Sequence, residues 1–201
     1  AKTGYTYDQM GRPLASTQTT DSTAYDFSYA WNTAGQLASV TYPSTRTLNY
    51  CYDAAYRPVG VRNGSGVCTP GDAAVYAGNG SYAPHGAIAS LTLGNGLVES
   101  WHYNTRLQPD WIRLGPEGSG PWKLQNFYCP NEETSCTVNN GNVRSQKLTV
   151  GGTQLSLTEY GFDGVNRLTS ATATGTLGWA QTYGYGGQFG NLTIAGSGDA
   201  T

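Results

Sequence analysis

A short aromatic motif recurs along this chain of 201 residues and constrains its fold more than any other feature. The clearest copy, residues 5–12, reads Tyr-x-Tyr-Asp-x-x-Gly-Arg. Its second aromatic recurs, with drift, at positions 7, 31, 52, 82, 103, 128, 162 and 185, a period of roughly 23 residues with insertions. A fixed period of this length indicates an array of one small structural unit.

Each copy is predicted to be a β-hairpin. Two aromatics separated by one residue lie on the same face of a strand, where their rings are expected to stack on those of the neighbouring copy. Asp or Asn then starts a turn, and Gly tolerates the positive φ that closes it. The repeat aromatics are Tyr5, Tyr7, Tyr29, Trp31, Tyr50, Tyr52, Tyr82, Trp101, Tyr103, Tyr160, Phe162, Tyr183 and Tyr185. Because one hairpin is marginal in water, the copies must pair edge to edge.

Composition agrees with an all-β fold. Charged residues make up 12% of the chain, against a usual figure of about 25%. The chain has 28 Gly and 15 Tyr, residues that disfavour helix interiors or favour strands. We therefore predict an all-β protein of repeated hairpins.

Charge argues against a nucleic-acid partner. The formal net charge is -2, and the basic residues are scattered rather than clustered as phosphate binding requires. No stretch approaches the roughly 18 apolar residues of a membrane span, and no signal peptide opens the chain.

Four cysteines, in two pairs close in sequence, predict disulfides and an oxidising compartment. We favour Cys51 with Cys68 and Cys129 with Cys136, although four cysteines allow three connectivities. A zinc site fits less well, because no CxxC spacing occurs. Three glycosylation sequons begin at Asn63, Asn79 and Asn191, although chance produces such triplets easily in a chain rich in Asn, Ser and Thr.

The repeat resembles the RHS, or YD-repeat, family over nearly the whole chain. The most specific stretches are residues 5–12, 82–91, 94–109, 139–145 and 160–171. The family includes carriers of polymorphic toxins, the cocoon subunits of insecticidal toxin complexes, and the teneurins of animal cell surfaces. The resemblance implies a secreted or surface-bound hairpin ribbon, wound spirally into a hollow shell or tube, whose repeats have no catalytic activity.

Two departures limit what the resemblance implies. Members that enclose a toxin usually end in a core segment with an Asp-Pro-x-Gly-Leu type motif, and this chain has none, so self-cleavage is not expected here. Within the repeats, Tyr56 and Asn166 replace the turn Gly, and Gly186 replaces the Asp.

The sequence offers little for catalysis. GxSxG, HExxH and P-loop motifs do not occur. Glu132 and Glu133 are interpreted as a solvated loop tip, and His85 and His102 as structural residues. The stretch 115–121 is interpreted as a long turn. We expect neither an enzyme nor a cofactor.

Three functions remain open. The first is a structural segment of a secreted or cell-surface protein that builds a shell, stalk or fibre. The second is a glycan-binding or adhesive module that uses Trp111, Trp122 and Asn126 in the long insertions. The third is a fragment of a toxin-enclosing cocoon. The tryptophans discriminate between the first two, because packing against the sheet favours structure and an open aromatic cluster favours glycans.

Residues 1–201 are interpreted as one array of about eight hairpins, without a cap at either end and with a polar linker over 196–201. A second copy joined to the first would keep about 23 residues between Tyr185 and the next Tyr7. The chain is therefore expected to be part of a longer array, either covalently continuous or stacked head to tail.

Overall fold

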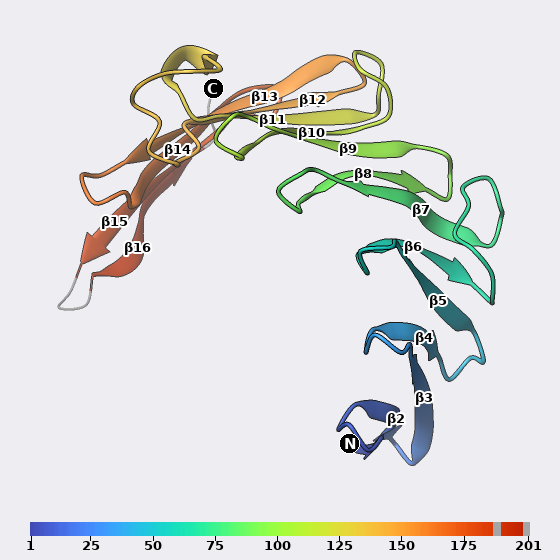
Figure 1. Cartoon of the computed structure of the whole chain (residues 1–201). Coiled ribbons are helices and arrows are strands. Elements are labelled where there is room, and N and C mark those ends of the chain that lie inside the picture. Colours follow the sequence, from blue (N-terminus) through green and yellow to red (C-terminus); the bar gives the residue numbers. More distant parts are fainter. Residues whose placement is uncertain (187–189, 199–201) are drawn as a thin grey trace. The chain divides into compact units, whose positions relative to one another are not determined.

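The structure is a computed structural model that describes residues 1–186 and 190–198. It is all-β, as predicted: the described residues form sixteen strands, and within each of two units the strands pair antiparallel in the order in which they occur along the chain (Figure 1). Contacts divide the chain into two compact units, residues 1–98 and 99–201. No helix in the described part of the chain is long and apolar enough to cross a membrane.

The first unit contains strands β1 to β8. Their bounds are β1 Lys2–Tyr7, β2 Pro13–Thr20, β3 Thr23–Trp31, β4 Leu37–Thr41, β5 Thr47–Tyr52, β6 Pro58–Asn63, β7 Val75–Tyr82 and β8 Ile88–Leu93.

The second unit contains the remaining strands. Their bounds are β9 Val98–Tyr103, β10 Pro109–Leu114, β11 Trp122–Phe127, β12 Ser145–Val150, β13 Thr153–Phe162, β14 Leu168–Gly175, β15 Trp179–Gly186 and β16 Asn191–Gly198. A short 3-10 turn, η1 (Pro130–Glu132), lies between β11 and β12. Strand β16 extends to Gly198, where a linker from 196 was expected. The turn residues 187–189 of the last copy and residues 199–201 of the expected linker lie outside the described residues.

The repeat motif forms one recurring turn. In the first copy, the backbone N–H of Asp8 donates to the carbonyl of Arg12 at 2.9 Å, and that of Gly11 donates to the carbonyl of Asp8 at 3.1 Å. The same pair of bonds recurs in the copies that start at Asn32, Asp53, Ala83, Asn104 and Asp163. In each of these hairpins the strand register shifts next to the turn, as in a β-bulge.

The fourth turn residue adopts a positive φ in every one of these copies. Glycine fills the position at Gly11 (φ 78°) and Gly35 (φ 81°), but Tyr56 (φ 62°), Leu107 (φ 63°) and Asn166 (φ 64°) adopt the same conformation. The left-handed region is sterically costly for tyrosine and leucine. The hairpin geometry therefore overrides local preference at Tyr56 and Leu107.

The register places the repeat aromatics of the first unit on one face of the sheet. Tyr5 lies opposite Ser16, which lies opposite Phe27, and Tyr29 lies opposite Val40. The other face carries mostly small and polar residues, among them Ala15, Thr17, Ala30, Ser39 and Thr41.

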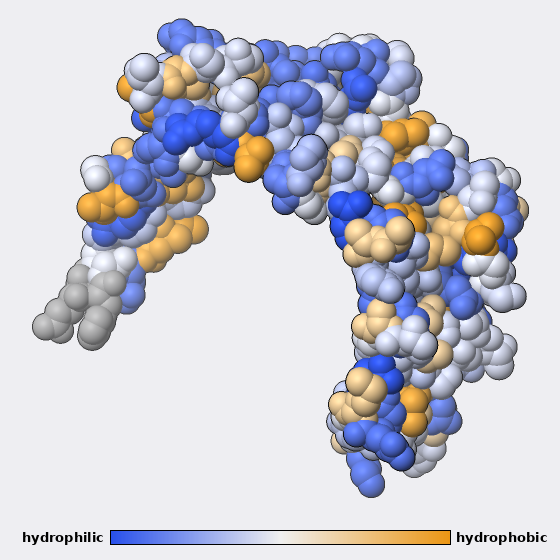
Figure 2. Space-filling model, viewed as in Figure 1, coloured by the Kyte–Doolittle hydropathy of each residue, from blue (hydrophilic) through white to orange (hydrophobic). Residues whose placement is uncertain are grey.

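The core of each unit is thin. Among the described residues, no large side chain is fully buried, and the most buried apolar residues are Val75 in the first unit and Ala171 and Ala173 in the second. Hydrophobic and hydrophilic residues are interspersed on the visible surface of each unit (Figure 2). Contacts between neighbouring hairpins must therefore contribute much of the stability that a deep core would otherwise supply.

Both disulfides have the pairing favoured from the sequence. Cys51 is bonded to Cys68 with a Cα–Cα distance of 6.1 Å, and Cys129 to Cys136 with 5.8 Å. The loop that carries Cys68 lies directly on strands β6 and β7. A Cβ atom added at Gly60 would lie 2.6 Å from the Cys68 Cβ, and one at Gly78 would lie 2.3 Å from the Cys68 carbonyl oxygen. Glycine at these positions lets the loop approach the sheet.

Replacing Tyr56 with glycine should stabilise the protein. Tyr56 is 63% exposed, so little buried surface is lost, and the strained backbone is relieved. We expect a gain of about 1 kcal/mol in the free energy of unfolding, measured by chemical denaturation. The neighbouring variant Ala55→Gly is the control, because Ala55 has no positive φ and the change should destabilise. A loss of stability in Tyr56→Gly equal to that of the control would contradict the assignment of strain.

Candidate functional site

The contact between successive hairpins is the most regular feature of the molecule, and it starts in the turn. Asp8 Oδ1 accepts hydrogen bonds from the backbone N–H groups of Met10 (2.8 Å) and Arg12 (2.9 Å), and Oδ2 accepts from Arg12 Nε at 2.7 Å. The turns at Asp53 and Asp163 repeat this arrangement with Arg57 and Arg167. The aspartate thereby fixes both the turn and the arginine side chain.

The arginine then covers a ring of the following hairpin. The guanidinium carbon of Arg12 lies 5.5 Å from the centroid of the Trp31 ring. Arg57 lies 4.3 Å from the Tyr82 ring, and Arg167 lies 4.3 Å from the Tyr185 ring. These distances suit cation–π attraction, worth about 0.5–1 kcal/mol at exposed sites.

The polar tip of the same ring donates to the backbone of the preceding hairpin. Trp31 Nε1 donates to the Pro13 carbonyl, and the Tyr185 hydroxyl donates to the Leu168 carbonyl, each at 2.8 Å. The same bond joins Tyr52 to Leu37, Tyr82 to Pro58, and Tyr128 to Pro109. All five acceptors lie at the register shift beside the turn, where a bulge leaves backbone groups outside the ladder. We call the combination of turn and ring tip the hairpin joint, and in three of these joints an arginine also covers the ring.

Two turns carry an amide version of the aspartate–arginine pair. Asn32 Nδ2 donates to Gln36 Oε1 at 3.0 Å, and Asn104 Nδ2 donates to Gln108 Oε1 at 2.9 Å. Gln36 reaches the carbonyl of Tyr56 in the next turn. The joint therefore exists in a charged form and a neutral form.

The hairpin joint differs from the ring-on-ring ladder expected from the sequence. At Trp31, Tyr82 and Tyr185, the contacts in the structure are with an arginine and a carbonyl of the preceding hairpin. The arginines were absent from the predicted site residues. The recurring Asp-x-x-x-Arg spacing at 8–12, 53–57 and 163–167 was the signal that could have identified them.

Strand β1 presents its rings without such a joint. Tyr5 and Tyr7 lie on the edge strand, 56% and 59% exposed, with ring centroids 6.2 Å apart. Because Tyr7 is this exposed, a Tyr7→Ala change should lower stability less than the loss of a buried aromatic would.

Other repeat aromatics lie against residues of the neighbouring strand. The Tyr29 hydroxyl lies 2.9 Å from Ser16 Oγ, and the Tyr160 hydroxyl donates to Gln146 Oε1 at 2.6 Å. Trp101 lies opposite Ile112 in the register. Burial raises the pKa of Tyr52, Tyr128 and Tyr160.

Two of the three residues proposed for glycan binding are packing residues. The Trp111 ring lies parallel to the His102 ring at 5.3 Å, and Arg113 lies 4.7 Å from it. Asn126 is buried and donates to the Pro109 carbonyl at 2.8 Å. All three residues border clefts: Trp122 lines one cleft, and Trp111 and Asn126 line a second.

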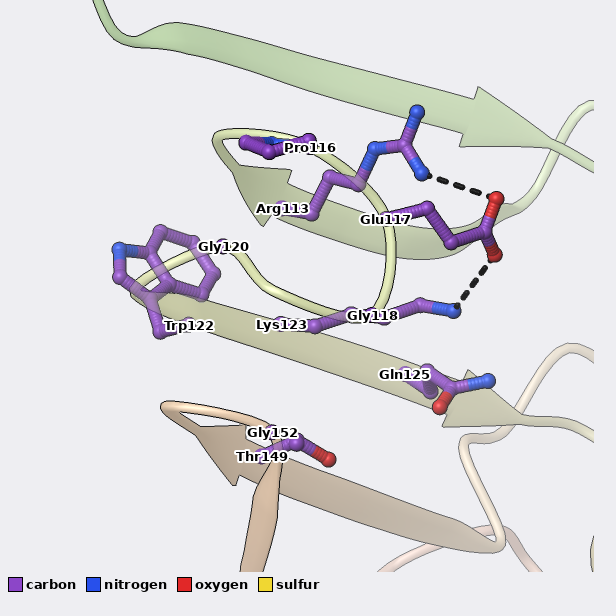
Figure 3. Close-up of a pocket in the computed structure, with 10 residues that line it drawn as sticks. All are labelled: Arg113, Pro116, Glu117, Gly118, Gly120, Trp122, Lys123, Gln125, Thr149 and Gly152. Atoms are coloured by element: carbon purple, nitrogen blue, oxygen red, sulfur yellow. Dashed lines mark ion pairs between the residues drawn. The ribbon is translucent and has the colours of Figure 1, made fainter.

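The cleft at Trp122 lies beside the loop that joins β10 to β11 (Figure 3). Glu117 on this loop binds both Arg113, at 3.1 Å, and Lys123, at 3.8 Å. The indole of Trp122 lies at the opposite end of the cleft from these ion pairs (Figure 3).

The remaining candidate residues have local roles. His102 Nδ1 lies 2.7 Å from Asp110 Oδ1, and Glu132 forms an ion pair with Lys147. The sequon residues Asn63, Asn79 and Asn191 are all exposed. No group of three or more potential metal ligands of the His, Cys, Asp or Glu type occurs within residues 1–186 and 190–198.

Comparison with known proteins agrees with the RHS resemblance. The RHS Repeat family model matches residues 31–67, which run from the end of β3 into the loop after β6. No curated protein sequence gives a significant match.

Solved structures share the fold. A TcdB2-TccC3-Cdc42 structure matches with a TM-score of 0.73 and 16% identity, over 98% of this chain and 11% of that chain. A Tc holotoxin pore structure from Photorhabdus luminescens matches with a TM-score of 0.67 and 17% identity, over 91% of this chain and 10% of that chain. The chain thus spans about a tenth of the length of these proteins.

The ring tip of the joint predicts a specific loss of stability. Tyr52→Phe removes the hydroxyl that donates to the Leu37 carbonyl and should lower the free energy of unfolding by about 1 kcal/mol. Tyr7→Phe is the matched control, because the Tyr7 side chain is 59% exposed, and it should change stability little. Equal effects of the two variants in denaturation experiments would contradict the role assigned to the ring tip.

The charged joints predict sensitivity to acid. The backbone hydrogen bond from each arginine, aided by the arginine side chain, lowers the pKa of Asp8, Asp53 and Asp163 below 3.8. Because the folded-state pKa is depressed, the stabilisation is present above pH 3.8 and is lost as the pH falls through the lower folded-state value.

The test compares wild type with Asp53→Asn/Arg57→Gln, which reproduces the natural pair Asn32 and Gln36. The thermal midpoint of the double variant should fall less steeply below about pH 4. Parallel pH profiles would show that the aspartate does not contribute this sensitivity.

Proposed function

We propose that this chain, which matches the RHS repeat at residues 31–67, is a non-enzymatic structural segment of a secreted or cell-surface protein. Its role is to form part of the wall of a shell, stalk or extracellular fibre. The single observation that carries the proposal is the hairpin joint, which occurs in both units and joins a hairpin to the one before it at Trp31, Tyr52, Tyr82, Tyr128 and Tyr185. In an array built on such joints, the side chains that recur with the repeat hold neighbouring hairpins together.

The contacts made by the recurring side chains support a structural role. Most of the side chains that recur with the repeat, namely the turn aspartates, the arginines and the ring tips, bind one another or the backbone. The ion pairs His102–Asp110 and Lys147–Glu132 are likewise consistent with packing roles.

A cocoon fragment is the specific form of this function that the comparisons favour. The fold is shared with structures of TcdB2-TccC3, over nearly the whole of this chain. We therefore propose that the segment contributes to an enclosing wall, and that the two disulfides reflect assembly in an oxidising compartment.

The exposed rings of β1 provide a surface on which a further hairpin can bind. In the described hairpin joints, a ring tip binds the carbonyl that follows the turn of a preceding hairpin. We propose that Tyr7 makes the same bond with a further YD hairpin, either in the same polypeptide or in a second copy stacked head to tail. The covering group would be the arginine of that hairpin, as in the joints at Trp31, Tyr82 and Tyr185.

The proposal is tested by the association state of the chain. Sedimentation velocity and electron microscopy at rising protein concentration should show edge-to-edge oligomers or short ribbons for wild type. Tyr5→Lys/Tyr7→Lys places two charges on the edge and should remain monomeric.

The control is Tyr25→Lys/Tyr56→Lys, which changes two exposed tyrosines away from β1 and should associate like wild type. A wild-type chain that stays monomeric at every concentration, or a β1 variant that associates equally well, would overturn the assignment of this edge.

A further inference from the structure

Two insertions in the second unit border the same two side chains. Residues 115–121 join β10 to β11, and residues 128–144 join β11 to β12. Each borders a cleft, of about 220 Å³ and about 230 Å³ respectively, and both clefts are lined by Lys123 and Gln125. In repeat proteins, insertions that interrupt the period often gather on the binding face.

The strand register explains why the clefts adjoin. Arg113 lies opposite Lys123, and Trp111 lies opposite Gln125, so these four side chains share one face of the β10–β11 pair. This is the opposite face from Ile112 and Leu124, which alternate with them along the strands. The clefts therefore form one surface, which Lys123 and Gln125 divide.

The wall of the second cleft is held in place before any ligand arrives. Glu133 and Thr134 line this cleft from the loop closed by the Cys129–Cys136 disulfide. The ion pair between Glu132 and Lys147 fastens the same loop to β12. A site with a preorganised wall loses less conformational entropy on binding.

The charges of this surface do not suit a polyanion. The basic groups Arg113, Lys123 and Lys147 are each paired with an acid, because Glu117 binds the first two and Glu132 binds the third. The second cleft also contains the carboxylates of Asp110 and Glu133. Nucleic acids and sulfated glycans require an excess of cations that this surface lacks.

The polar groups that line the two clefts suit the binding of hydroxyl groups. Lys123 and the Gln125 amide supply donors, whereas Glu117, Asp110 and Glu133 supply acceptors. A sugar hydroxyl donates and accepts at once, so it can bind both kinds of group. Trp122 in the first cleft and Phe127 in the second supply apolar surface.

We propose that the two clefts are adjacent subsites for a neutral oligosaccharide. Each cleft is smaller than the roughly 300–1,000 Å³ typical of sites for drug-sized ligands, and so suits a single sugar ring. Lys123 and Gln125 bind hydroxyls on both sides of the linkage between the rings. Trp111 acts as a wall, because His102 and Arg113 already lie against its ring. The site is independent of the structural role proposed above.

Isothermal titration with cellotriose, maltotriose and chitotriose tests the proposal on the full chain. Wild type should bind at least one of these three probes, with a dissociation constant at or below the millimolar range. Gln125→Ala should weaken binding about tenfold or more, since it removes a group common to both subsites. The matched control is Gln18→Ala, an exposed glutamine on β2 of the other unit, which should bind like wild type.

A second variant separates binding from folding. Thr134→Val changes an exposed hydroxyl on the disulfide loop and should weaken binding while the thermal midpoint stays at the wild-type value. Wild type that binds none of the three probes at millimolar concentration overturns the proposal. Tighter binding of a heparin oligosaccharide than of any neutral probe also overturns it, as does wild-type affinity in both Gln125→Ala and Thr134→Val.

Discussion

A polar ring tip that reaches back to a backbone carbonyl is the interaction on which this structure depends. A sheet with no large, fully buried side chain among its described residues gains little hydrophobic stabilisation. Each ring compensates by combining a hydrogen bond of about 1 kcal/mol with contact area and, in three joints, an arginine over its face. The ring serves as both apolar surface and hydrogen-bond donor, which explains why tyrosine and tryptophan dominate this position.

The turn and the contact with the next hairpin depend on the same side chains. Asp8 receives two backbone N–H groups and the Arg12 side chain, so the arginine is already oriented when the Trp31 ring meets it. The amide turns orient Gln36 and Gln108 by analogous bonds, without charge. Local turn chemistry and the contact between hairpins are therefore coupled, and a substitution in one affects the other.

Most of the fold could be predicted from the sequence, but less of the hairpin joint could. The period, the alternating aromatics and the turn residues were sufficient to predict an all-β array of hairpins, because each of those signals is local. The partner of each ring was not predictable in the same way. The arginine that covers Tyr82 lies 25 positions earlier, and the carbonyl bound by Trp31 belongs to a backbone group that no residue type identifies. Likewise, the clefts that share Gln125 depend on where two insertions fold.

The choice of a main-chain acceptor has an evolutionary consequence. Any residue supplies a carbonyl, so the ring of one hairpin does not require a particular side chain at position 13, 37 or 168 of its neighbour. A hairpin copied, deleted or moved by recombination would meet an acceptable partner at either junction. Arrays of this kind can change length by whole hairpins without a compensating mutation, and their sequences can diverge widely while the wall they form keeps its construction.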